Sequence, residues 1–259
     1  MRMMKKVLGT VTVLALSVSL LAGCGSTAVS PVSSTASTAA ESTTSSVVSE
    51  TTSAAADENE AAAAQLLNDL TGSYQELWPV ILADEYKQTW LDDCTALVGE
   101  DNAEAAFEKL SSMVTGDVYG EDAVKAYANG GGAYFCGFTN SLAILTFDGE
   151  TSTISGTDKD GNVLFSHTYH YIGMEPVRGL YEFQSDDADS GEFTYFFLAP
   201  DTSAETYHIE FRYGSDADAL SQYDAGDYAY WLASGISTDC DQTMIDNCIE
   251  LFCTENLAG

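Results

Sequence analysis

Two different spacings of apolar residues divide this chain, and they meet at the glycine run Gly130–Gly132. Before the run, apolar residues recur every three or four positions, which is the helical period. Tyr86, Trp90, Cys94 and Leu97 form one such stripe. Asp101 and Glu104 are spaced as a capping box for the next helix, which Gly116 ends. We predict helices over residues 59–70, 84–98, 101–115 and 121–128.

After the glycines, apolar and polar residues alternate, which is the period of strands. Asp148-Gly149 and Asp160-Gly161 are typical of tight hairpin turns. A last helix is expected over 239–254, with Thr238 as its N-cap. Short links without intervening helices indicate an antiparallel up-and-down sheet, closed or strongly curled, in an α+β, mainly antiparallel β, fold. We predict strands over residues 133–138, 141–147, 151–156, 163–172, 178–184, 192–199 and 205–213.

The first 23 residues have the pattern of a secretory leader. Arg2, Lys5 and Lys6 precede an apolar run that is too short to span a membrane comfortably. The leader ends in Leu-Ala-Gly-Cys, which resembles the bacterial lipobox, whose cysteine is acylated. We therefore expect residues 1–23 to be removed and Cys24 to carry the lipid. The mature protein would be extracytoplasmic and held at the cell membrane through its lipid anchor alone.

Residues 24–58 are dominated by Ser, Thr and Ala and contain no aromatic residue. Such a segment cannot bury a core, and we interpret it as a disordered tether. The remaining residues, 59–259, suffice for one domain.

The charge of the chain is strongly negative, with 9 basic and 40 acidic residues. Three of the basic residues lie in the leader, so the mature chain is more acidic still. Nucleic acid and anionic lipid surfaces are poor partners for such a protein, whereas cations suit it. An acidic surface also keeps an exported protein soluble, and charge alone does not identify a ligand.

Five cysteines remain besides Cys24, an odd number for an exported protein. None is spaced as C-x-x-C. We interpret them mainly as small buried apolar residues and allow for one disulfide.

Signatures of enzymes are missing from the sequence. It contains neither a G-x-S-x-G elbow nor a phosphate-binding G-x-x-x-x-G-K-S/T loop. Asp158, Asp160 and Asn162 have some likeness to a calcium loop, but their spacing fits a hairpin turn better. We expect a protein that is not an enzyme.

The three histidines are His167, His170 and His208. His208 shares a strand face with Glu210, and Ile209 lies on the opposite face. Residues two apart on a strand are separated by about 6.6 Å, and imidazole with carboxylate suits zinc. Two donors do not complete a zinc site, however, and a solvent-facing strand gives the same polar pattern.

Several motifs occur in the order in which they occur in the ZinT (YodA) family. Residues 69–79, D-L-T-G-S-Y-Q-E-L-W-P, resemble the opening of that family's domain. The later matching segments are Val177-Arg178, Tyr181–Phe183, Leu198–Pro200, His208–Gly214 and Tyr228–Trp231. This resemblance covers roughly residues 60–255. It implies a lipocalin-like (calycin) barrel with N-terminal helices and a C-terminal helix.

The resemblance also implies a function, namely binding of zinc, and of cadmium, to assist zinc uptake by an ABC importer. The family's three metal-binding histidines correspond here to Phe196, His208 and Glu210, or to Thr206 and His208 if the gap moves. His170 is the expected third ligand, with His167 or a carboxylate as the alternative. The alternative function is a metal-free lipocalin-like binding or interaction module that has lost the full metal site.

Overall fold

The computed structural model describes residues 47–200 and 208–258, with side chains from residue 58 onward. Eight strands form one closed barrel in which each strand is antiparallel to the next and β8 pairs with β1. This up-and-down architecture is that of lipocalins and confirms the predicted fold class. The strands are β1 (Gly72–Glu76), β2 (Ile144–Asp148), β3 (Thr153–Thr157), β4 (Val163–Met174), β5 (Tyr181–Ser185), β6 (Tyr195–Leu198), β7 (His208–Gly214) and β8 (Ala233–Ser237).

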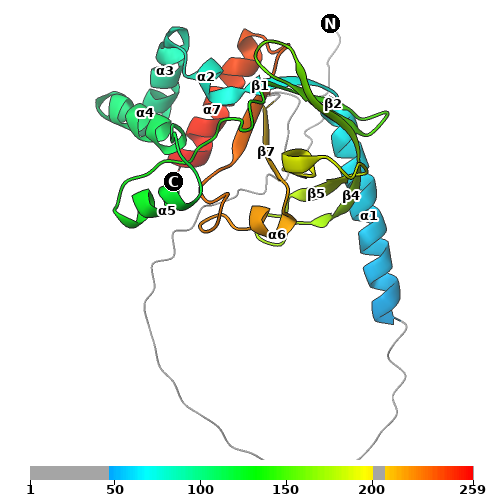
Figure 1. Ribbon diagram of the computed structural model, residues 1–259. Helices are drawn as coiled ribbons and strands as arrows, with labels where there is room; N and C mark the ends of the chain where they lie inside the picture. Colours follow the sequence, from blue (N-terminus) through cyan, green and yellow to red (C-terminus); the bar gives the residue numbers. More distant parts are fainter. Residues whose placement is uncertain (1–46, 201–207, 259) are drawn as a thin grey trace, which may run out of the picture. The chain divides into compact units, whose positions relative to one another are not determined.

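Most helices gather on one side of the barrel, whereas α1 runs along β2 and β4 (Figure 1). Among the described helices, none is long and apolar enough to cross a membrane. The helices are α1 (Val47–Asp69), α2 (Leu77–Ile81), α3 (Lys87–Val98), α4 (Glu100–Val114), α5 (Glu121–Ala128), α6 (Ala217–Leu220) and α7 (Gln242–Leu257), with short 3₁₀ turns η1 (Asp84–Tyr86) and η2 (Gly191–Phe193).

Two apolar cores result from this arrangement. One fills the barrel and includes Phe147, Phe183 and Phe211. The other lies between the barrel wall and the helices, where Trp90 of α3 and Ile249 of α7 meet Ile236 on the outer face of β8. The wall formed by β7 and β8 therefore has a buried inner face and an outer face that helices cover.

Both predicted hairpin turns are present, and their aspartates hold them. Asp148 Oδ1 accepts hydrogen bonds from the backbone N–H groups of Glu150 and Thr151 at 3.1 and 3.3 Å. Asp158 Oδ1 accepts from the N–H groups of Asp160 and Asn162, both at 2.9 Å. The pKa of Asp158 is lowered mainly by the side-chain amide of Asn162, which donates to Oδ2 at 2.9 Å, and then by these backbone bonds. The second segment is thus a hairpin turn, as the sequence indicated, and not a calcium loop.

The strand predictions need three corrections. Residues 133–138 form only isolated bridges, because the N–H of Phe138 is bonded to Glu76 and that of Thr139 to Tyr213. Strands β1 and β8 were not predicted as strands. The β8 sequence, A-S-G-I-S, consists mostly of small residues, and a Cβ at Gly235 would lie 3.1 Å from Ile209 Cγ1.

Helix boundaries also differ from those predicted. Gly99, with a φ of 84°, both ends α3 and precedes α4, so Asp101 and Glu104 lie inside the helix and form no capping box. α7 begins at Gln242 with Asp241 as its N-cap, in place of Thr238. α1 begins at Val47, within the range predicted as a tether, in an alanine-rich sequence that favours helix. Residues 24–46 of that tether lie outside the described part of the chain.

Candidate functional site

Strand β7 has the two-sided pattern predicted from the sequence. Ile209, Phe211 and Tyr213 are buried in the barrel core. His208 and Glu210 lie on the opposite face and are half-buried. Tyr207 and Thr206 lie outside the described residues.

The outer face of β7 is covered by protein. His208 pairs with Ile236 of β8, whose side chain belongs to the core beneath the helices. Burial raises the pKa values of Cys136 and Cys248 to about 12, and the charge of Glu210 contributes to both shifts. Glu210 therefore lies near two buried thiols, between the barrel wall and α7.

His170 projects from the outer face of β4, where it is exposed. Its Nδ1 lies 2.6 Å from Asp186 Oδ1. His167 precedes His170 by three residues and therefore lies on the inner face, between Phe165 and Tyr169. Its Nδ1 lies 2.8 Å from Asp187 Oδ2. Each histidine is thus oriented by a neighbouring carboxylate, as metal-binding histidines often are.

The structure does not bring the three predicted ligands together. Strands β5 and β6 separate β4 from β7, so the outward side chains of His170 and His208 diverge. Among the described residues, no three His, Cys, Asp or Glu side chains are placed to hold one metal ion. His208, Glu210 and His170, as placed, do not fit a zinc ion as a set.

Phe196 lies on the other side of the wall from His208 and Glu210. It pairs with Tyr213 of β7, and directly paired residues share a face of the sheet. Its ring is completely buried in the barrel, 5.4 Å from that of Tyr213. A site that includes the position of Phe196 would therefore use inward-facing residues of β7.

Aromatic side chains fill the region of the barrel where such a site would lie. Phe193 of η2 stacks on Phe165 with ring centroids 3.9 Å apart, and its carbonyl accepts the hydroxyl of Tyr169. Burial raises the pKa values of Tyr169 and Tyr213, so both stay neutral at physiological pH. These rings provide packing and no metal-binding charge.

A pocket lies at the end of β1, where the strand passes into α2, and the sequence analysis did not single it out. Its volume is about 340 Å³, and it lies between the end of β1, the end of α4 and the segment 135–137. Gly116 is required here, because a Cβ would lie 2.3 Å from the carbonyl oxygen of Ala133. Its lining residues include Glu76, Trp78, Leu82, Val114, Phe135 and Cys136. We call this recess the outer pocket.

No known family model matches the sequence, and no curated protein matches it. Among solved structures, the chain is similar to the zinc-bound ZinT-like domain of Streptococcus pneumoniae AdcA, at 14% identity and a TM-score of 0.45, over 71% of this chain and 89% of that one. It is also similar to zinc-bound AdcA of the same organism, at 12% identity and 0.43, over 72% of this chain and 35% of that one. The zinc belongs to those proteins; the fold class here rests on the strand order.

Proposed function

We propose that this chain is a membrane-tethered extracytoplasmic binding protein, without catalytic activity, that takes a small ligand in the outer pocket. The observation that carries the proposal is the filled barrel. Small barrels either pack their interior with side chains or hold a ligand there. Here Phe165, Phe196 and Tyr213 occupy the interior, so binding is assigned to the pocket at the end of β1.

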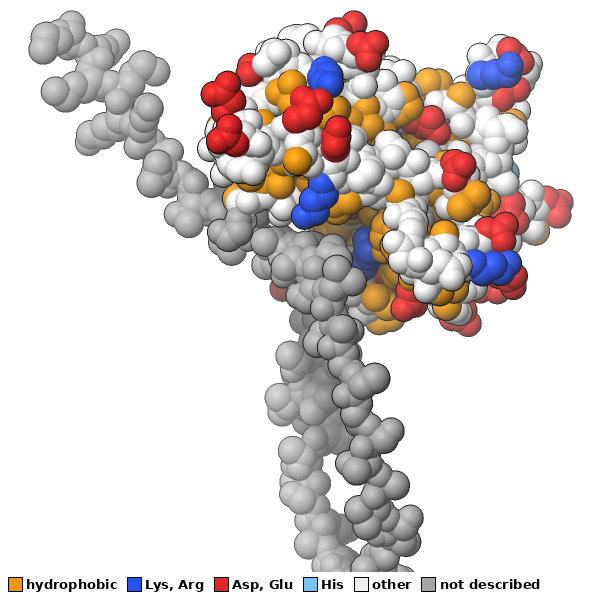
Figure 2. All heavy atoms as spheres, turned by 90° about the vertical axis from the view of Figure 1, so that its left-hand side faces the viewer, with side chains coloured by type: hydrophobic (Ala, Val, Ile, Leu, Met, Phe, Trp, Pro, Cys, Tyr) orange, Lys and Arg blue, Asp and Glu red, His pale blue; other side chains and the backbone are white. Residues whose placement is uncertain are grey.

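The outer pocket has the character of a small-molecule site. Such sites measure about 300–1,000 Å³ and combine apolar walls with a few polar groups. Leu82, Val114 and Phe135 supply the walls, and the carboxylate of Glu76 supplies a charge. Figure 2 shows the side of the molecule that carries α3, α4 and α5, where apolar side chains are exposed among scattered acidic ones.

An NMR screen with small apolar fragments tests this function. Binding should shift the indole N–H signal of Trp78 and leave the ring signals of Tyr169 and Phe196 in place. Shifts confined to the interior rings would place the ligand inside the barrel. If no fragment binds at millimolar concentration, the small-molecule function is rejected.

A second candidate is the zinc function, with delivery of zinc to an ABC importer as its purpose. It is supported by the order of the ZinT-like motifs and by the donor types near Glu210. His208 shares the strand face of Glu210, whose charge influences the thiols of Cys136 and Cys248; as placed, no three of these described side chains hold one metal ion, so zinc would have to draw them together. Imidazole, carboxylate and thiolate are all zinc ligands.

A zinc titration in competition with a chelator separates the two candidates. If zinc binds on the outer face of β7, His208→Ala and Glu210→Gln should each weaken it at least tenfold. His170→Ala, on a distant strand, is the matched control and should leave it unchanged. Binding that is absent, or equal in all four proteins, rejects zinc at this face.

A further inference from the structure

We propose that the outer pocket binds a small organic ammonium ion, that is, an amine whose apolar body also carries a hydrogen-bond acceptor. This inference rests on the proposed function and specifies its ligand. Glu76 would hold the ammonium group, the indole N–H of Trp78 would donate to the acceptor, and the apolar side chains would enclose the body. Each of the three parts has its own observation.

The carboxylate of Glu76 is fixed at the pocket. Its Oε1 accepts a hydrogen bond from the backbone N–H of Phe138 at 2.6 Å. A carboxylate has about four lone-pair positions, and this bond uses one of them. Gly137 keeps the group uncovered, because a Cβ there would lie 2.9 Å from Oε1. Glu76 is thus oriented and still able to accept from a ligand.

Trp78 differs from the other two tryptophans. The indole N–H groups of Trp90 and Trp231 donate to the carbonyls of Ile81 and Gly137, at 2.7 and 2.9 Å. Trp78 is only 8% exposed, yet its N–H has no hydrogen-bond partner. It lies near enough to the Cys136 sulfur to lower the pKa of that thiol, but the pair does not meet hydrogen-bond geometry. A buried donor without a partner destabilises the free protein, and a small turn of the indole toward the pocket would let a ligand acceptor remove that cost.

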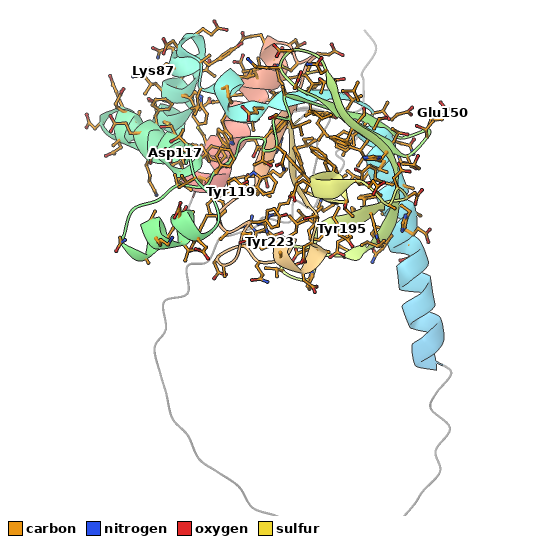
Figure 3. All side chains as sticks on the ribbon, viewed as in Figure 1. Lys87, Asp117, Tyr119, Glu150, Tyr195 and Tyr223 are labelled. Carbon is orange, nitrogen blue, oxygen red and sulfur yellow. The ribbon has the colours of Figure 1, made fainter. Side chains whose placement is uncertain are left out.

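The walls and the charge of the pocket favour a cation. The rings of Trp78 and Phe135 line it, and aromatic faces attract ammonium groups. Tyr119, labelled in Figure 3, lies between α4 and α5 and stacks on Phe135 at 5.6 Å, which holds that ring in place. Within a chain of net charge −31, an anionic ligand would be repelled.

Three related probes separate the two polar contacts. Tyramine carries an ammonium group and a phenol oxygen, phenethylamine lacks the oxygen, and 4-ethylphenol lacks the ammonium. Ligand-observed NMR titration of the full mature protein measures each affinity. We expect tyramine to bind most tightly, by about fivefold or more over either of the other two.

Two variants complete the design, with Glu108→Gln, on the exposed face of α4, as the matched control. Glu76→Gln keeps an acceptor for Phe138 and should weaken both amines about tenfold while sparing 4-ethylphenol. Trp78→Phe keeps a ring and should weaken tyramine and 4-ethylphenol about fivefold while sparing phenethylamine. The thermal midpoint of each variant checks its folding; if Trp78→Phe does not fold, Glu76→Gln and the probe series decide.

The outcomes distinguish this inference from the proposed function. Fragments that bind at the outer pocket without any preference for amines would overturn the ammonium ligand and leave the binding function standing. Equal affinities of the wild type and Glu76→Gln for tyramine would also overturn it. No binding of any probe or fragment would overturn both.

Discussion

Arg212 is a completely buried arginine on the same face of β7 as His208 and Glu210. Its guanidinium donates to the backbone carbonyls of Leu220, Gln222 and Tyr228, and thereby ties the loop between β7 and β8 to the barrel wall. It also packs on the ring of Tyr223, with its Cζ 4.4 Å from the centroid. Burial lowers its pKa, yet an arginine remains charged.

We predict that Arg212→Met destabilises the fold by about 2 kcal/mol, because the buried carbonyl of Leu220 and the partly buried carbonyls of Gln222 and Tyr228 lose their donor. Removing a buried charge relieves some desolvation, but one relieved group does not offset three lost acceptor contacts. Arg178→Met is the matched control. Arg178 lies over the same Tyr223 ring at 4.3 Å but is half-buried, so its loss should cost under about 1 kcal/mol. Urea unfolding measures both, and equal costs would contradict this account.

At this scale, the sequence predicted which face each residue of β7 occupies, because alternation needs only local spacing. It did not predict that the polar face would be covered, or that His170 would be oriented away from His208. Those facts depend on strand order and on helix packing, which no local pattern records. Trp78 and Glu76 were noticed only as part of a family-like motif, since an unpartnered N–H is visible only once all its neighbours are placed.

The pair of helices α3 and α7 illustrates how elements hold together in this chain. Cys94 and Cys253 meet across their interface with sulfurs 3.9 Å apart, and the described cysteines are free thiols. Asp93 lies beside Cys94, and its carboxyl has a raised pKa, first because of burial and then because of Glu250 and Asp246 on α7. Its Oδ2 is buried without a hydrogen-bond partner. The ionised carboxylate of Asp93 therefore destabilises the interface between α3 and α7.

We predict that Asp93→Asn stabilises the protein at pH 7 by a few tenths to about 1 kcal/mol. The pKa of Asp93 is higher in the folded state than its unfolded value of 3.8. The protonated carboxyl therefore stabilises the folded state fully below pH 3.8, and this stabilisation is lost as the pH rises through the folded pKa. The advantage of Asn should therefore disappear in acid. Unfolding experiments at pH 7 and below pH 4 test this, with the exposed Asp92→Asn as the control. A gain that persists unchanged in acid would contradict it.

Elements with long, strongly periodic sequences were predicted well, and those made of small residues were not. β4 and α5 were identified from their spacing, and α5 has the predicted bounds. β8 was missed because Ala233, Ser234 and Gly235 show no alternation of apolar and polar residues. A larger residue at Gly235 would crowd the ring of Phe138 and the side chain of Ile209. The observed helix ends differ from the predicted ones by a few residues. Gly99 precedes α4 with a positive φ, and Asp241 is the N-cap of α7.

At the scale of the whole molecule, closure of the barrel and net charge act together. The pairing of β8 with β1 leaves the barrel without exposed strand edges that could pair with other chains. An acidic surface adds repulsion between copies. It also repels an anionic membrane, so the lipid expected on Cys24, which lies outside the described residues, would be the only attachment.

The last prediction concerns that attachment. Each buried CH₂ contributes about 0.8 kcal/mol, so a lipid with two or three acyl chains anchors the protein firmly and independently of salt. The wild-type protein should therefore stay with membranes through a high-salt wash. Cys24→Ala should abolish labelling with a radioactive fatty acid and leave the protein as an unprocessed precursor or release it into the medium. Cys240→Ala, at a half-buried cysteine of the folded domain, is the control and should be labelled normally. Normal labelling of Cys24→Ala would refute the anchor, and loss of the wild-type protein in high salt would show that charge, not lipid, holds it at the membrane.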